Sequence, residues 1–280
     1  MFLKHFSFMM MKEKELLFEK YLSILALKKS NPNYDFLRKI VKAHLIKIPF
    51  ENISKLLLKK HRINYIPSLS EYLNGIEQYN FGGTCYANNY YLNLLLKFLG
   101  YNIKLCGADM KNPDVHLISI VTIDNKEFIV DCGYAAPLFN PLPRDVKNDF
   151  TFSFGDEKYI IKMQDSKGHT KVEQYFNGKL QHWYSAKPEP RKIDEFRKII
   201  KESYEDDATF MNAIRITRFT ENGSLVLINL YLTEIVDDNI TTTKIERKDL
   251  PIIIEQKFGI PSQVVAKATS HLQELKDIYD

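Results

Sequence analysis

The amino-acid sequence predicts an α+β protein, because helical and strand patterns occupy different parts of the chain. Apolar residues recur with helical spacing through most of the chain before Gly100. After Gly100 β-branched residues dominate, and the spacing changes to that of strands. The C-terminal part mixes both patterns without the regular strand–helix alternation of a parallel α/β fold. We therefore expect helices first, a strand-rich middle and a mixed end.

The N-terminal part is predicted to form helices over residues 12 to 60 and again over 85 to 99. A broad stripe of leucines opens the first stretch, and the N-P-N segment at 31–33 interrupts it. A second apolar run follows and stops at Pro49. Gly100 comes directly after the later helix, where glycine commonly ends a helix.

The middle of the chain is predicted to form antiparallel hairpins. The segments H-L-I-S-I-V-T-I (116–123) and E-F-I-V-D (127–131) flank Asp124-Asn125, which is a strong signal for a tight turn. The segments Y-I-I-K-M (159–163) and K-V-E-Q-Y-F (171–176) continue the strand pattern.

The C-terminal part is predicted to contain both strands and short helices. Residues 188–190 resemble a linker, and I-D-E-F-R-K-I-I (193–200) resembles a short helix. Two strands are expected at 213–220 and 224–232, and a helix near 251–258 precedes a last helix at the C-terminus.

Composition excludes several classes of function. The chain has 280 residues, of which 45% are hydrophobic and 26% charged, as in ordinary globular proteins. The net charge of +4 does not indicate a nucleic-acid partner. No run of about 18 apolar residues occurs, so no membrane-spanning segment is expected. The three cysteines lack the spacing of a disulfide framework or a metal site, which favours the cytoplasm and no metal.

A candidate nucleophile lies in the segment F-G-G-T-C at 81–85. The two glycines allow a sharp turn, Thr84 is a suitable N-cap, and Cys85 then enters the first turn of a helix. The positive end of the helix dipole favours a thiolate there. The alternative is an inert buried cysteine, which is the interpretation that we keep for Cys106 and Cys132.

A nucleophilic cysteine needs a base and a group that orients the base, and the first hairpin offers both. If the two residues between its strands form the turn, Ile123 pairs with Lys126. Counting outward then pairs Ile118 with Asp131, so His116 shares a face with Asp131 on the diagonal. Diagonal neighbours lie about 7–8 Å apart at the backbone, within reach of these side chains. The alternative is that both residues are merely the polar ends of a half-buried hairpin.

This combination of segments resembles the arylamine N-acetyltransferases. In that family a G-G-x-C segment begins a helix, a histidine begins a strand, and V-D-x-G-[FY] ends the next strand. The matching segments here cover about residues 18 to 265: H-L-I-K-I-P-F-E-N at 44–52, F-G-G-T-C at 81–85, V-H-L at 115–117, V-D-C-G-Y at 130–134, Y-S-A-K-P-E-P-R-K-I-D-E-F at 184–196, T-F at 209–210 and L-P-I-I-I-E-Q-K-F-G-I at 250–260.

The resemblance implies three domains and a papain-like Cys-His-Asp arrangement. A helical domain (1–100) would carry the nucleophile, a β-barrel domain (101–190) the histidine and aspartate, and an α/β lid (191–280) would follow. It also implies a ping-pong acetyl transfer from acetyl-CoA through the cysteine to an arylamine, arylhydrazine or similar small amine. Acceptor and coenzyme A would contact five residues in particular: Asn112, Pro113, Val115, Gly133 and Tyr134.

Two positions depart from the family pattern. The arginine expected four residues before the nucleophile is Phe81 here, and the glutamate or glutamine two residues after it is Ala87. Glu51 would thereby lose a cationic partner, so we expect it to accept local hydrogen bonds instead. Phe81 is expected to pack among the aromatic residues of the helix at 86–99. Two alternatives stay open: a cysteine amidase or hydrolase with the same triad, and a non-catalytic homologue that binds coenzyme A.

Overall fold

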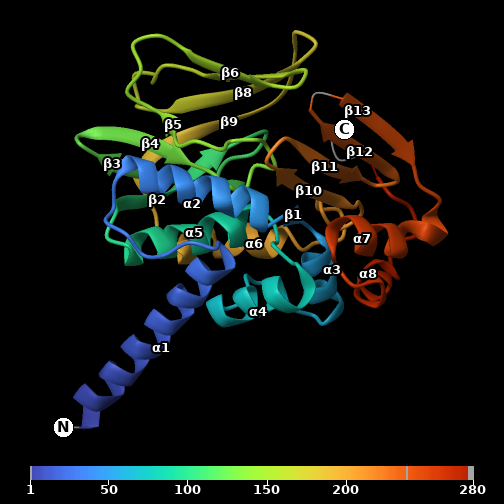
Figure 1. Cartoon of the computed structure of the whole chain (residues 1–280), viewed down its shortest axis with the longest axis horizontal. Helices are drawn as coiled ribbons and strands as arrows, with labels where there is room; N and C mark the ends of the chain where they lie inside the picture. Colours follow the sequence, from blue (N-terminus) through green and yellow to red (C-terminus); the bar gives the residue numbers. More distant parts are fainter. Residues whose placement is uncertain (1, 238, 277–280) are drawn as a thin grey trace.

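The computed structural model describes residues 2–237 and 239–276 and confirms the α+β class. Five helices precede the first long strand, and the longest of them, α1, extends away from the rest of the molecule (Figure 1). The last of the five, α5, packs against the two strands that begin at Asn102 and His116. The helices are α1 (Phe2–Ile24), α2 (Tyr34–Lys47), α3 (Ile53–Lys60), α4 (Leu69–Tyr79) and α5 (Cys85–Phe98).

The central part of the chain forms an eight-stranded, barrel-like antiparallel sheet. Its strand order is β5-β4-β3-β2-β9-β8-β7-β6, which places the β3–β4 hairpin between β5 and β2. The strands are β2 (Asn102–Asp109), β3 (His116–Ile123), β4 (Lys126–Val130), β5 (Leu142–Pro143), β6 (Phe150–Phe154), β7 (Glu157–Ile161), β8 (Thr170–Phe176) and β9 (Lys179–Pro190).

A second sheet, of five strands, joins the C-terminal region to the helical region. Its order is β1-β10-β11-β12-β13, and β1 comes from the N-terminal part of the chain (Figure 1). The strands are β1 (Phe50–Glu51), β10 (Arg215–Thr220), β11 (Gly223–Ile228), β12 (Tyr231–Val236) and β13 (Asn239–Lys244). The accompanying helices are η1 (Ile193–Phe196), α6 (Arg197–Glu202), η2 (Arg247–Asp249), α7 (Leu250–Phe258) and α8 (Ser262–Thr269).

The expectation of a linker at 188–190 is wrong, because these residues belong to β9. The pairing of β9 with β8 extends no further along β9 than Ala186. Pro188 and Pro190 come after this residue, where β9 pairs only with β2. The register with β2 also shifts between Cys106 and Ala108. Prolines are tolerated where a strand has one paired edge or a bulge.

The single strand expected at 224–232 is also wrong, since the chain turns at Asn229. This residue adopts a left-handed backbone conformation (φ 52°), and Ile228 pairs directly with Tyr231 across the turn. The Asn229 amide accepts a hydrogen bond from the Ile214 backbone (2.9 Å) and donates one to the Lys276 carbonyl (2.8 Å). The sequence did not indicate this turn, because the apolar Leu230 within it continues the hydrophobic strand pattern. β13 was not predicted.

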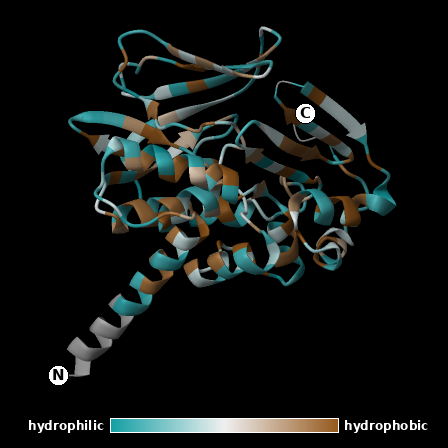
Figure 2. Ribbon diagram, viewed as in Figure 1, coloured by the Kyte–Doolittle hydropathy of each residue, from teal (hydrophilic) through white to brown (hydrophobic). Residues whose placement is uncertain are grey.

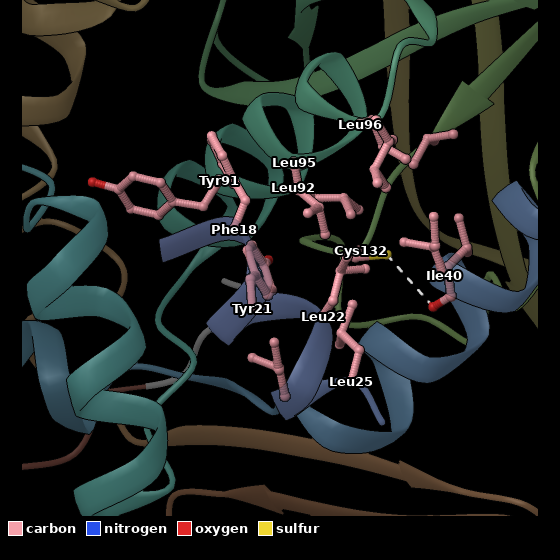
Figure 3. Close-up of a cluster of buried hydrophobic side chains, with 14 of the residues drawn as sticks. Phe18, Tyr21, Leu22, Leu25, Ile40, Tyr91, Leu92, Leu95, Leu96 and Cys132 are labelled. Carbon is pink, nitrogen blue, oxygen red and sulfur yellow. Dashed lines mark hydrogen bonds between the residues drawn. The ribbon is translucent and has the colours of Figure 1, made fainter. Parts of the chain in front are cut away.

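Hydrophobic and hydrophilic residues alternate around α2, as expected of a helix with one buried face (Figure 2), whereas α5 is buried on nearly every side in the same hydrophobic core. Cys132 lies within this core among Leu22, Ile40 and Leu92 (Figure 3). Burial raises the pKa of the Cys132 thiol well above its usual value. Burial likewise raises the pKa of Cys106 to about 12. Both cysteines are therefore buried core residues, as predicted. No helix in the described part of the chain has the length and hydropathy of a membrane span.

His44 is a structural residue of the same helical region. It lies on α2 with no solvent exposure, and its Nε2 is 2.9 Å from the Tyr21 hydroxyl. Burial lowers the pKa of His44 to about 3, so the imidazole is neutral in the folded protein at neutral pH. The unfolded chain binds a proton at this residue below about pH 6.5, which favours unfolding in acid.

We predict that replacing His44 removes part of the acid sensitivity of the fold. Because its pKa is lower in the folded state, its contribution to stability is lost as the pH falls below about 6.5. Between pH 7 and pH 5 this should cost about 2 kcal/mol. His44→Gln keeps a hydrogen-bonding group near Tyr21 but does not titrate. Urea unfolding of both proteins at the two pH values measures the difference, and equal pH dependence would contradict the prediction.

Candidate active site

The β3–β4 hairpin has the predicted register. Asp124 and Asn125 both adopt left-handed conformations (φ 49° and 61°), as a two-residue turn requires. Ile123 pairs with Lys126 across this turn, and the ladder then continues without a bulge to the end of β4. His116 at the start of β3 and the residue that follows β4 consequently lie on the same face.

His116 and Asp131 form a buried pair. The distance between His116 Nε2 and Asp131 Oδ2 is 2.7 Å, and the two residues are only 1% and 2% exposed. Burial alone would lower the pKa of His116. The Asp131 carboxylate and the Cys85 side chain outweigh burial and raise this pKa to about 10. Both neighbours therefore favour the protonated form of the imidazole.

Cys85 lies within interaction range of His116, since it contributes to the raised pKa. It is the first residue of α5 and is half-buried, and its Sγ lies 4.0 Å from the Val115 carbonyl oxygen. Asp131 engages Nε2, so Nδ1 is the imidazole nitrogen that remains for the thiol. Thr84 occupies the N-cap position with an extended backbone, but its side chain makes no capping hydrogen bond. The structure thus brings the three predicted side chains together.

Asn89 is a site residue that the sequence analysis missed. It lies one helical turn after Cys85, and its Nδ2 donates to Asp131 Oδ1 (2.8 Å) and to the Leu117 carbonyl (2.5 Å). Its Oδ1 accepts a hydrogen bond from the Cys132 backbone (2.8 Å). The Gly133 backbone supplies a further donor to Asp131 Oδ1 (2.9 Å). These donors orient the carboxylate that faces the histidine.

Glu51 accepts local hydrogen bonds, as predicted. The carboxylate is fully buried, and its Oε1 accepts from the Gly82 backbone (3.1 Å), the Gly83 backbone (2.7 Å) and the Ser54 hydroxyl (2.6 Å). The Ser54 backbone donates to Oε2 (2.8 Å). The four donors replace the missing cation and fix the two glycines that precede the nucleophile.

Gly82 has no space for a side chain, whereas the side chain of the neighbouring Phe81 is half-exposed. A Cβ on Gly82 would lie 1.8 Å from the Pro49 carbonyl oxygen, so the turn needs glycine. The Phe81 ring lies 5.2 Å from the ring of Tyr79 and approaches Gly75, both on α4. Phe81 also packs against the core cluster that contains Tyr86 of α5, so the expected packing is found in part, and the side chain stays half-exposed.

Three of the five residues expected to contact acceptor or coenzyme A, Val115, Gly133 and Tyr134, lie beside Cys85 or His116. Asn112 and Pro113 are exposed on the loop that leads into β3, and the Val115 carbonyl faces Cys85. Gly133 packs directly on the nucleophile, because a Cβ there would lie 2.6 Å from Cys85 Cα. The ring centroid of Tyr134 lies 5.8 Å from that of His116.

Comparison with known proteins identifies the family. The model of a family described as N-acetyltransferase matches residues 33–267. The chain belongs to the arylamine N-acetyltransferase family. It is therefore an enzyme. A pineal gland isozyme of arylamine N-acetyltransferase from Gallus gallus is 26% identical over 263 residues, which cover 82% of this chain and 88% of that protein.

Solved structures of arylamine N-acetyltransferases share the fold. The enzyme from Mycobacterium abscessus superposes with a TM-score of 0.78 at 14% identity and covers 92% of this chain and 96% of its own. The enzyme from Mycobacterium marinum in complex with CoA gives a TM-score of 0.76 at 17% identity, covering 90% and 98%. The fold is thus the expected one: a helical domain, a central barrel domain and a C-terminal α/β lid.

We predict that Phe81→Arg does not improve this arylamine N-acetyltransferase homologue. Glu51 already accepts four hydrogen bonds, and the substitution removes half-buried apolar surface, which should cost about 1 kcal/mol. Glu51→Gln, by contrast, places an amide group among backbone donors and should cost about 2–4 kcal/mol. Chemical denaturation measures both. A clear gain in stability and in acyl transfer with Phe81→Arg would show that Glu51 lacks a partner.

We predict that Asn89→Asp disturbs the site more than Asn93→Ala. The first change places a second carboxylate against Asp131, whereas the second removes a hydrogen bond to Ser119 (3.0 Å) one turn further along α5. Both should destabilise the fold by about 1–3 kcal/mol. Only Asn89→Asp should also slow alkylation of Cys85 in the folded protein. Equal alkylation rates in the two variants would remove Asn89 from the site.

Proposed function

We propose that this protein transfers an acetyl group from acetyl-CoA, through a thioester on Cys85, to an arylamine, an arylhydrazine or a similar small amine. The observation that carries the proposal is the placement of Cys85 beside an imidazole that Asp131 holds at 2.7 Å. A thiol, a base and an orienting carboxylate are the groups that covalent acyl transfer needs.

In the first half-reaction the Cys85 thiolate attacks the thioester carbonyl of acetyl-CoA. The carbon–sulfur bond to coenzyme A breaks, and the protonated His116 gives its proton to the leaving thiolate. Asp131 keeps the imidazole in the orientation that this transfer needs. The products are free coenzyme A, an acetylated Cys85 and a neutral imidazole.

In the second half-reaction the acceptor amine attacks the acetyl carbonyl. His116 accepts the proton that the amine loses, and Cys85 leaves as a thiolate. The amide product departs, and the thiolate and the imidazolium are restored. The cycle consumes only acetyl-CoA and the amine, and it returns Cys85 and His116 to their starting protonation states.

The substrates would approach along the loop that precedes β3. Exposed Asn112 and Pro113 would contact coenzyme A, and Val115, Gly133 and Tyr134 would border the acceptor. The CoA complex of the Mycobacterium marinum enzyme, which has the same fold, supports a coenzyme A site here. In this scheme residues 1–100 supply the nucleophile, 101–190 the base and its partner, and 191–280 the lid. A reducing cytoplasm would keep the thiol reactive.

The hydrogen bonds of Glu51 favour catalysis over a non-catalytic role. Of the two departures that suggest lost activity, Phe81 and Ala87, the first would leave the buried Glu51 carboxylate unpaired beside Cys85. Its four donors remove that first reason, because the loop before Cys85 is held without the arginine.

We predict that incubation with acetyl-CoA adds one acetyl group at Cys85. Intact-mass spectrometry should show a single addition that Cys85→Ala abolishes. Asp131→Asn should leave the fold intact but slow acetylation by roughly 10²–10⁴-fold, because the imidazole loses its orienting charge. Cys106→Ala, which changes a buried thiol of the barrel, is the matched control and should be acetylated normally.

The same experiment separates acyl transfer from hydrolysis. Addition of an arylamine should remove the acetyl group and yield the amide, whereas buffer alone should leave the thioester largely in place. Rapid loss in buffer would favour the hydrolase. Acetylation of a lysine, or acetylation that persists without Cys85, would refute the mechanism.

A further inference from the structure

A cavity of about 320 Å³ lies on the other side of the loop that presents the nucleophile. It is bounded by α3, α4, the start of α5 and the end of α6, and neither Cys85, His116 nor Asp131 lines it. Its volume lies within the range of small-molecule sites, about 300–1,000 Å³. The wall is rich in aromatic rings: Tyr65, Tyr72, Tyr79, Phe81, Tyr86 and Tyr204.

One buried cation interrupts this aromatic wall. Lys55 is only 5% exposed, and its Nζ donates to the Ser203 hydroxyl (2.8 Å) and lies 4.7 Å from the centre of the Tyr204 ring. The Ser203 hydroxyl in turn donates to the Ile200 carbonyl (2.6 Å). An ammonium group has three donors, so neutral partners satisfy this one only in part.

No carboxylate balances this charge. Within residues 2–237 and 239–276, Lys55 forms no ion pair. The one acidic residue of the cavity wall, Glu71, is exposed and accepts a hydrogen bond from the Ser68 backbone (2.7 Å). A buried charge without a paired carboxylate is costly, and burial lowers the pKa of Lys55 to about 8, although the Cys85 side chain acts in the opposite direction. An anion in the cavity would remove that cost.

We propose that the cavity is a second ligand site, which binds a planar aromatic carboxylate with its ring among the tyrosines and its carboxylate on Lys55. The aromatic wall gives apolar area and edge or face contacts to a flat ring. The carboxylate gives Lys55, which is itself buried, a charge-assisted hydrogen bond. The ligand is not an acceptor, because the reacting thiol does not line this cavity.

The test is isothermal titration at pH 7 with naphthalene-2-carboxylate and with its neutral counterpart, naphthalene-2-carboxamide. Wild-type protein should bind the carboxylate at one saturable site, at least about tenfold more tightly than the carboxamide. In Lys55→Met the two probes should bind equally. Lys60→Met is the matched control, since Lys60 lies on the same helix but contacts Ser270, and it should keep the preference.

A third variant locates the site. Leu58 lines the cavity, so Leu58→Trp should fill it and abolish binding of both probes. Absence of saturable binding to wild-type protein at millimolar concentration would overturn the proposal. A carboxylate preference that survives Lys55→Met would also overturn it, whatever the behaviour of Leu58→Trp. Unchanged binding in a folded Leu58→Trp would show that the probe binds outside this cavity and would equally overturn the proposal. None of these outcomes depends on acetyl transfer.

Discussion

The buried carboxylate of Glu51 connects the parts of the molecule that meet at the nucleophile. It lies on β1, which pairs with β10 of the C-terminal sheet, and it also binds the backbone of Gly82 and Gly83. Glu51 therefore joins the C-terminal sheet through its backbone and the loop before Cys85 through its side chain. Without its donors the burial of this charge would be costly, so the loop and the carboxylate stabilise each other.

Asp131 has the corresponding role on the other side of α5. It directly follows β4, and its carboxylate accepts hydrogen bonds from the Asn89 side chain on α5 and from the Gly133 backbone. The loop before Cys85 is thus held by one buried carboxylate and His116 by another, and the two carboxylates come from the helical region and from the barrel-like sheet. Both carboxylates are almost saturated with donors, which gives the site a rigid geometry before any substrate arrives.

The sequence alone could predict the β3–β4 hairpin and the common face of His116 and Asp131. A two-residue turn and the two-residue period of a strand leave little freedom in the register. The partners of Glu51 were also predictable, since a buried carboxylate must find donors. Asn89 was not, because an asparagine within a helix has no pattern of its own. The turn at Asn229 and the strand at 188–190 depend on contacts with distant segments, which the spacing of neighbouring residue types does not reveal.

The raised pKa of His116 has a consequence for the timing of proton transfer. Two neighbours sustain the imidazolium, the carboxylate of Asp131 and the side chain of Cys85. In the proposed cycle, acetylation of Cys85 would turn the sulfur into a neutral thioester, and one of the two contributions would disappear at that moment. The imidazolium would then release its proton more readily to the coenzyme thiolate, and the neutral imidazole that remains would be free to accept the proton that the incoming amine loses. The covalent intermediate itself would convert the acid into a base.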